Sequence, residues 1–148
     1  MVQILNKIKG ERISLVIDKF VPEDKIKGYV PAILYHVVLN KNNEIIGHCS
    51  ARVGWNESMY YCGHIGYSIN EEYRGNGYAV EAVNLIKKVF KVNNIGVVYI
   101  TNSPDNHASI RVCEKLGAKF VERREFSEQD LKRLASEDSF KNIWKLRL

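Results

Sequence analysis

The sequence predicts an α/β fold: one mixed, mostly antiparallel sheet with a central parallel strand pair and flanking helices. Three observations predict it. Strand-like segments fill the first half of the chain, an amphipathic helical segment occupies residues 77–92, and a short apolar segment at 97–101 follows that helix. A strand–helix–strand crossover makes the strands on its two sides parallel, whereas the strands before it are close enough along the chain to form hairpins.

In the first half, residues 12–20, 32–39, 44–52 and 60–69 are predicted strands, because they are rich in β-branched and aromatic residues. The Asn-Lys-Asn-Asn turn at 40–43 joins the second and third strands into a hairpin. Residues 21–31 are polar and predict a connection or a single short helix. Gly63 and Gly66 inside the fourth strand indicate a bulge or the close approach of another backbone or a ligand.

In the second half, the helix at 77–92 has one apolar face, formed by residues that recur at helical spacing: Ala79, Val83, Ile86 and Phe90. A second helix is predicted at 106–116, closed by Gly117. Strands follow at 119–125 and 142–148. Between these strands, Ser127 to Asp130 resemble a capping box that opens a short helix.

Composition fits one domain over residues 1–148, with 45% hydrophobic and 26% charged residues. The three cysteines are odd in number and lack zinc spacing, so we expect reduced thiols and no metal. The start of the chain does not resemble a signal peptide and no apolar run is long enough to span a membrane, which predicts a cytoplasmic protein. The net charge is +5, but the basic residues are scattered. A small polyanion suits this charge, and a nucleic-acid-binding domain remains an alternative.

Residues 70–79 carry the strongest chemical signal. They join a strand to a helix start, where unpaired N–H groups and the helix dipole attract anions. Gly75 and Gly77 allow the backbone to approach a phosphate. The run lacks the Lys-Ser/Thr of a Walker loop, and Val80 occupies the third glycine position of the dinucleotide fingerprint. The alternative is that the two glycines only make a tight turn.

Two motifs carry a resemblance to a known family. Arg74-x-x-Gly77-x-Ala79 matches the Arg/Gln-x-x-Gly-x-Gly/Ala signature of the GNAT superfamily of N-acetyltransferases. Residues 102–109 and 114–120, with Asn, a small residue and Glu-Lys-Leu-Gly, look like the family's second motif. The resemblance covers residues 64–120. Within the family, this segment is similar to the branch that acetylates ribosomal-protein N-termini and small amines. It implies that the parallel strands splay apart around acetyl-CoA, the co-substrate.

The resemblance also implies roles for individual residues. Backbone N–H groups in the glycine turn would hold the pyrophosphate, with two polar side chains shaping the turn. The strand before the turn would pair with pantetheine, and residues of the second motif would contact it from the other side. The N–H donors are those of Gly75, Gly77, Tyr78 and Ala79, and the polar side chains are Arg74 and Asn76. The strand residues are Tyr67, Ser68 and Ile69, and those of the second motif are Asn102, Asn106 and Ser109.

For catalysis, the resemblance implies direct transfer to a primary amine in a ternary complex, with a backbone N–H near Tyr67 stabilising the oxyanion. His64 is the leading candidate base, and His48 and Glu57 are weaker ones. Cys113 occupies the position of the tyrosine acid that the family often uses. Cys113 donates a proton there or is a small buried residue, in which case coenzyme A leaves as thiolate or takes its proton from water.

The acceptor side is the least determined part of the sequence. The family usually has two helices after the first strand, but residues 21–31 have room for about one short turn. The acceptor site is therefore open, or is completed by residues 54–59, by 126–139 or by a second subunit in a homodimer. The acceptor is a small amine or a peptide N-terminus. Transfer of a longer acyl group, and a coenzyme A-binding regulatory module without turnover, remain alternatives.

Overall fold

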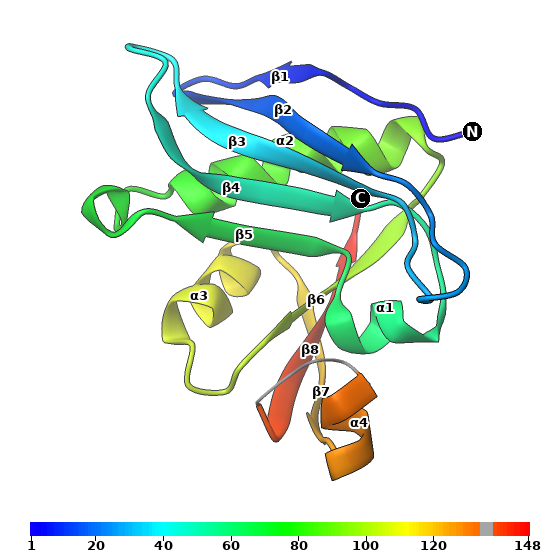
Figure 1. Ribbon diagram of the computed structural model, residues 1–148. Helices are drawn as coiled ribbons and strands as arrows, with labels where there is room; N and C mark the ends of the chain where they lie inside the picture. Colours follow the sequence, from blue (N-terminus) through cyan, green and yellow to red (C-terminus); the bar gives the residue numbers. More distant parts are fainter. Residues whose placement is uncertain (134–137) are drawn as a thin grey trace.

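The computed structural model describes residues 1–133 and 138–148, and these form two sheets with flanking helices (Figure 1). The first sheet has five antiparallel strands in chain order: β1 (Lys7–Lys9), β2 (Ile13–Val21), β3 (Ala32–Leu39), β4 (Ile45–Arg52) and β5 (Ile65–Ile69). The second sheet has the order β6 (Val97–Asn102), β8 (Phe140–Arg147) and β7 (Lys119–Glu125).

The helices are α1 (Glu57–Cys62), α2 (Tyr78–Val92), α3 (His107–Lys115) and α4 (Glu128–Arg133), with a 3-10 turn, η1, at Glu71–Tyr73. The helix α2 lies behind the first sheet in Figure 1 and buries its apolar face against β2, β4 and β5. The largest fully buried side chains in this layer include Phe90 and Ile86. No helix among the described residues is long and apolar enough to cross a membrane.

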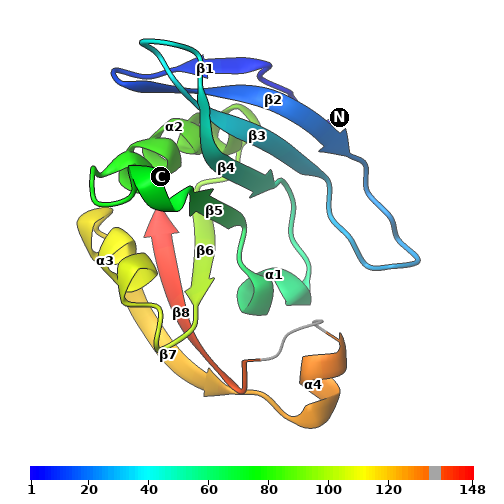
Figure 2. The ribbon, with the colours of Figure 1, turned by 60° about the vertical axis from the view of Figure 1, so that its left-hand side comes forward.

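The crossover at β5, α2 and β6 confirms the predicted architecture. In Figure 1 the arrows of β5 and β6 both point left, and Figure 2 shows the two strands diverging. They meet where the His64 N–H donates to the Tyr99 carbonyl at 2.7 Å, just before β5. Beyond that point the strands belong to different sheets. The single mixed sheet expected from the sequence is thus divided at its parallel pair.

The predicted strand at 60–69 is correct only in its second half. Residues up to Cys62 form α1, which buries Met59 and sets the Tyr60 ring edge-on against Tyr99. Gly63 ends this helix at φ +79°, and a Cβ there would lie 3.2 Å from the Tyr99 carbonyl oxygen. The predicted close approach of another backbone is therefore confirmed at Gly63.

The remaining outcomes are local. Of the two alternatives for residues 21–31, the structure has the connection and not the short helix. A bridge pairs Asp24 with Tyr29, and the Asp24 carboxylate accepts from the backbone N–H groups of Ile26 and Lys27. The edge strand β1 was not predicted, because three residues carry too little pattern. The capping box is confirmed: the Asp130 N–H donates to Ser127 Oγ, and the Ser127 N–H donates to the Asp130 carboxylate.

Candidate functional site

The glycine turn lies open at the start of α2. Gly75 and Gly77 adopt φ +82° and +80°, and in the described structure nothing lies within 4 Å of a Cβ built on Gly75. The first helical hydrogen bond runs from the Glu81 N–H to the Gly77 carbonyl. The N–H groups before Glu81 therefore have no partner within the helix. Among the described residues, no side chain caps this helix start, so the turn offers amide protons to an anion from solvent.

Side chains of the turn brace its backbone. The Asn76 side-chain amide donates to the Tyr73 carbonyl at 3.0 Å, which closes the turn on itself. The Arg74 Nε donates to the Ile69 carbonyl at 2.8 Å and so ties the turn to the end of β5. Both contacts support the shaping role that the family resemblance implied for Arg74 and Asn76.

Arg12, just before β2, is a third brace and was not anticipated. Its Nη1 donates to the Asn76 carbonyl at 2.8 Å, its Nε donates to Glu81 Oε1 at 2.8 Å, and its guanidinium carbon lies 4.6 Å from the centre of the Tyr78 ring. Glu81 Oε2 also accepts from the backbone N–H groups of Arg12 and Ile13. One side chain thus contacts the turn, the first ring of α2 and the carboxylate beneath them.

Glu81 needs this partner for electrostatic reasons. A carboxylate in the first turn of α2 opposes the binding of a second anion there. Desolvation raises the pKa of Glu81, but hydrogen bonds from Arg12 and Ile13 outweigh it, and the net pKa is lowered. The carboxylate therefore stays ionised, and its charge is neutralised by Arg12 at a position where it would repel phosphate.

Among the described residues, no strand pairs with the edge of β5 that faces the second sheet beyond His64. On the side of β4, the Arg52 N–H donates to the His64 carbonyl and the Asn70 N–H donates to the Ile46 carbonyl, each at 2.8 Å. In an antiparallel pair, successive residues of a strand direct their backbone N–H and C=O groups alternately toward and away from the partner strand. Since residues 64 and 70 bond to β4, the odd-numbered residues between them direct these groups away from β4. Tyr67 and Ile69 therefore present backbone groups to the space between the strands, although the Ile69 carbonyl is already bound by Arg74.

A hydrogen-bonded network closes the other side of this space. The Tyr67 hydroxyl lies 2.7 Å from Ser109 Oγ, and the Asn102 side-chain amide donates to Ser109 Oγ at 3.2 Å. The Asn102 side-chain oxygen, Oδ1, accepts from the Trp144 indole N–H at 3.1 Å. Burial raises the pKa of Tyr67, so its hydroxyl remains a donor. The network joins β5, β6, α3 and β8 at the point where the sheets part.

The network changes the interpretation of Asn102. Its side chain is buried and its polar atoms bind Trp144, Ser109 and Cys113. This geometry favours a structural role over the pantetheine contact implied by the resemblance. Asn106, in contrast, is exposed and caps α3 by accepting from the Ser109 N–H at 3.1 Å.

His64 has the geometry of a structural residue. It is 1% exposed; its Nδ1 accepts from the Tyr99 N–H at 3.0 Å, and its Nε2 lies 3.1 Å from the Gly54 carbonyl. These contacts require a neutral ring with the proton on Nε2. Desolvation lowers its pKa to about 4. Since neither nitrogen is free to take a proton from an amine, we assign His64 to holding β5 and β6 together, in place of the base role expected.

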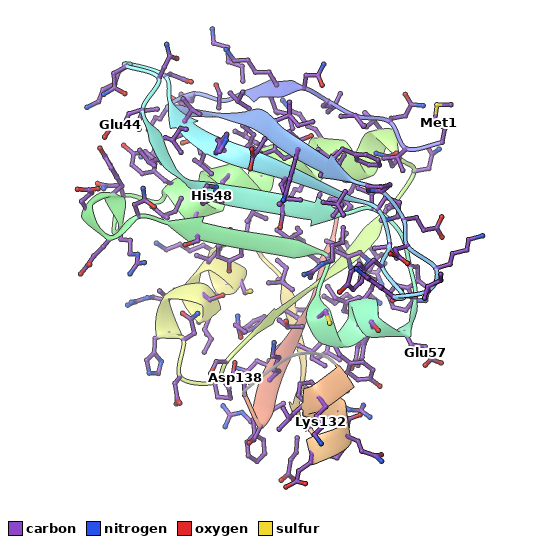
Figure 3. All side chains as sticks on the ribbon, in the orientation of Figure 1. Met1, Glu44, His48, Glu57, Lys132 and Asp138 are labelled. Carbon is purple, nitrogen blue, oxygen red and sulfur yellow. The ribbon has the colours of Figure 1, made fainter. Side chains whose placement is uncertain are left out.

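Cys113 is also enclosed. It is 0% exposed, and the Asn102 side-chain amide donates to its sulfur at 3.6 Å. Burial raises its pKa to about 12. A thiol this weakly acidic and this buried is unsuited to protonate a leaving group, so the geometry favours the alternative of a small core residue. Of the weaker base candidates, Glu57 lies at the outer end of α1, whereas His48 lies on the sheet (Figure 3).

The site therefore combines a solvent-facing anion turn with an unpaired strand edge in a divided α/β sheet, an arrangement typical of proteins that bind a nucleotide diphosphate with an extended arm. The acetyltransferase (GNAT) domain family matches residues 14–119, and the chain belongs to this family. Members of this family use acetyl-CoA. Among the described residues, no cluster of three or more histidine, cysteine or acidic side chains could hold a metal ion.

Individual proteins are similar to this chain in sequence or in fold. YnaD of Bacillus subtilis, an uncharacterized N-acetyltransferase, is 33% identical over 86 residues, which are 57% of this chain and 49% of YnaD. The ribosomal-protein-S5-alanine acetyltransferase of Vibrio fischeri is 24% identical, with a TM-score of 0.61 over 78% of this chain and 61% of that one. MccE, a microcin C7 self-immunity acetyltransferase in complex with acetyl-CoA and AMP, is 19% identical, with a TM-score of 0.60 over 79% and 61%. The chain thus spans about half the length of the curated relative it matches.

Arg12 and Glu81 are the site residues that the sequence interpretation missed. They are 69 positions apart, and no local pattern links them. One signal was available: an acidic residue in the first turn of a helix that is expected to bind an anion needs a neighbouring cation. The sequence could not indicate which cation lies beside it.

Proposed function

We propose that this protein is an acetyl-CoA-dependent N-acetyltransferase that moves an acetyl group to a primary amine. Its turn at 74–79 would hold the pyrophosphate through backbone N–H groups. The pantetheine arm would lie along the β5 edge at Tyr67 and Ile69, with Asn106 and Ser109 on the opposite side. The supporting observation is the uncapped, solvent-facing helix start directly after a strand whose free edge diverges from its neighbour.

The protein's own groups would do three things in this reaction. Backbone N–H groups of the turn bind and orient the anionic end of the co-substrate. The Tyr67 N–H, on the unpaired edge, would donate to the carbonyl oxygen of the thioester as it gains charge. The core behind β5 excludes water from that strand, with Ile65 and Ile69 buried. The amine must lose a proton before it attacks, so a base or a water chain must accept that proton.

Calorimetry with acetyl-CoA, followed by free-thiol release with a panel of amines and peptides, tests the proposal. Gly77→Glu places bulk and negative charge against the phosphates, so we expect its affinity to fall by more than a hundredfold. Gly117→Glu is the matched control, because Gly117 is also exposed, has φ +74° and has nothing within 4 Å of its Cβ among the described residues. Equal binding by both variants would refute the turn as the phosphate site.

One observation favours a second candidate, a coenzyme A-binding regulatory module without turnover. The two side chains expected to move protons, His64 and Cys113, are both buried and hydrogen-bonded. This candidate predicts the same loss of binding in Gly77→Glu, but no thiol release with any amine or peptide. Comparing acetyl-, propionyl- and succinyl-CoA as donors in the same assay distinguishes acetyl transfer from transfer of a longer acyl group.

A further inference from the structure

The face of the first sheet that points away from α2 is uncovered by any helix of the described chain (Figure 1). Along β4, His48 is exposed and Ser50 half-buried on this face, while Cys49 and Ala51 are buried on the other. A pocket of about 280 Å³ lies here, open across the strands. Its lining residues include Asp18, Leu34, His48, Ser50, Gly66 and Ser68.

A row of ionisable side chains crosses this face. His36 of β3 is the register partner of His48 on β4, which is in turn the partner of Ser68 on β5. The rings of His36 and His48 are 5.4 Å apart between centroids, and His36 Nε2 lies 3.4 Å from Asp18 Oδ1. Asp18 is the extra residue of a β-bulge in β2, a device that aims a side chain out of the regular ladder.

One atom of this row lacks a hydrogen-bond partner. His36 Nδ1 is buried and unpaired within the described part of the chain. A buried polar atom without a partner is uncommon in a folded protein and indicates a place where a ligand or water completes the hydrogen bonding. The His36 Nε2 faces Asp18, so Nδ1 is the other ring nitrogen through which the imidazole can exchange a proton.

The charges select the kind of ligand. Asp18 supplies a carboxylate, and no lysine or arginine of the described chain lines the pocket. A larger pocket of about 740 Å³, between the loop at 21–30 and α1, is lined by three basic side chains, Lys25, Lys27 and Arg52, and one carboxylate, Glu57. Its charge is therefore net positive, which disfavours a cation. An ammonium group is therefore favoured in the pocket with Asp18 and disfavoured in the larger one.

The pocket also adjoins the proposed reacting centre. Gly66, Tyr67 and Ser68 line it, and Tyr67 has its backbone groups on the free edge of β5. An amine in the pocket and a thioester on that edge would thus lie on the two sides of one strand end. Because Gly66 has no side chain, the space beside Ser50 stays open: among the described residues, a Cβ at position 66 would lie only 2.9 Å from the Ser50 hydroxyl oxygen.

We propose that this pocket is the acceptor site for a small primary amine, with Asp18 binding the ammonium group and His48 removing its proton; this rests on the proposed acetyl transfer. His48 takes one proton from the ammonium and passes it through His36 or to solvent. The nitrogen lone pair forms the bond to the acyl carbon, the carbon–sulfur bond breaks, and the second nitrogen proton goes to the leaving sulfur. The products are the amide, the free thiol and one released proton.

Kinetics of two variants test the site, with ethylamine, putrescine, tyramine and an alanyl tripeptide as acceptors. Asp18→Asn should raise KM for the preferred amine about tenfold, the loss of a charge-assisted hydrogen bond. His48→Gln should lower kcat about a hundredfold. Both should leave the acetyl-CoA Kd unchanged. Glu23→Gln removes the same charge from the exposed loop before Asp24 and should change neither constant.

The pH–rate profile adds a readout that a structural role would not move. The ionisable side chains that line the pocket from β2 to β5 are Asp18, Tyr35, His48, Cys49 and Tyr67, and His36 lies beside it against Asp18 and His48. By strand register, Lys7 and Lys9 of β1, Lys19 of β2 and Arg52 of β4 lie on the same face of the sheet without lining the pocket. If His48 removes the proton, the acid limb of the wild-type pH–rate profile should be flatter in His48→Gln. Imidazole signals in the NMR spectrum should also shift when putrescine is added without acetyl-CoA.

The outcomes are separable. A wild-type protein that binds no acetyl-CoA overturns the proposed function and this inference with it. A protein that binds acetyl-CoA and releases thiol, but whose Asp18→Asn and His48→Gln variants behave like Glu23→Gln, overturns only the acceptor site. Activity confined to the peptide, with no response to any of the three amines, overturns the assignment to a small amine.

Discussion

Replacing Arg12 with glutamine should weaken coenzyme A binding although Arg12 lies outside the motif. The change removes the hydrogen bonds from Nη1 to the Asn76 carbonyl and from Nε to Glu81, both 2.8 Å. Charge-assisted hydrogen bonds contribute about 1.5–3 kcal/mol when sheltered. The Arg12 side chain is 47% exposed, so we take about 1 kcal/mol for each. The sum, about 2 kcal/mol, is the largest cost that re-ordering the turn on binding can carry, and it corresponds to a Kd up to about 30-fold higher.

A second variant identifies which part of that loss is electrostatic. Without Arg12, the Glu81 carboxylate faces the phosphate site with only backbone N–H partners. Adding Glu81→Gln to Arg12→Gln removes that repulsion and should restore part of the affinity. Isothermal titration with coenzyme A measures all three Kd values, and thermal unfolding confirms that each variant is folded. A folded Arg12→Gln that binds within twofold of wild type, or a double variant no better than the single one, would refute the reasoning.

Two further predictions concern the junction of the sheets. Burial lowers the pKa of His64 from 6.5 to about 4, so between these pH values the unfolded chain binds a proton that the folded protein does not. The free energy of unfolding should therefore fall by up to about 3 kcal/mol as pH drops from about 6.5 toward 4. Urea unfolding should show this fall in wild type and a flatter pH dependence in His64→Gln. Asn102→Ala leaves the buried Trp144 indole without its acceptor and should lower the free energy of unfolding by about 1–3 kcal/mol. Asn102→Asp keeps an acceptor and serves as the control. An unchanged urea midpoint for the alanine variant would contradict the structural role assigned to Asn102.

The elements with strong local signals were predicted from the sequence. The apolar face of residues 77–92 has a helical period, so α2 begins and ends close to the predicted bounds. The hairpin of β3 and β4 follows from two alternating segments around an asparagine-rich turn. Gly75 and Gly77 in that context predicted positive φ and an open helix start, and the structure has both. Each of these features is determined by residues near one another in the chain.

Failures occurred where long-range packing overrides local preference. Tyr60 and Tyr61 favour a strand by composition, but their rings pack on Tyr99 and Phe126, and a helix presents them to both. The candidate acceptor segment at 126–139 includes residues 134–137, which lie outside the described residues. For His64 the residue type suggested a base, and only its neighbours Gly54 and Tyr99 show that both nitrogens are bound.

The sequence by itself determined the order of most elements, the anion turn and the family, because these depend on spacing and backbone freedom within short segments. Only the tertiary structure decided which side chains meet. Arg12 beside Glu81, the Asn102 network and the row from Asp18 to His48 each join residues from strands or helices far apart in the chain. Burial and hydrogen bonding then set which of these groups is free to act, and neither quantity exists before the chain has folded.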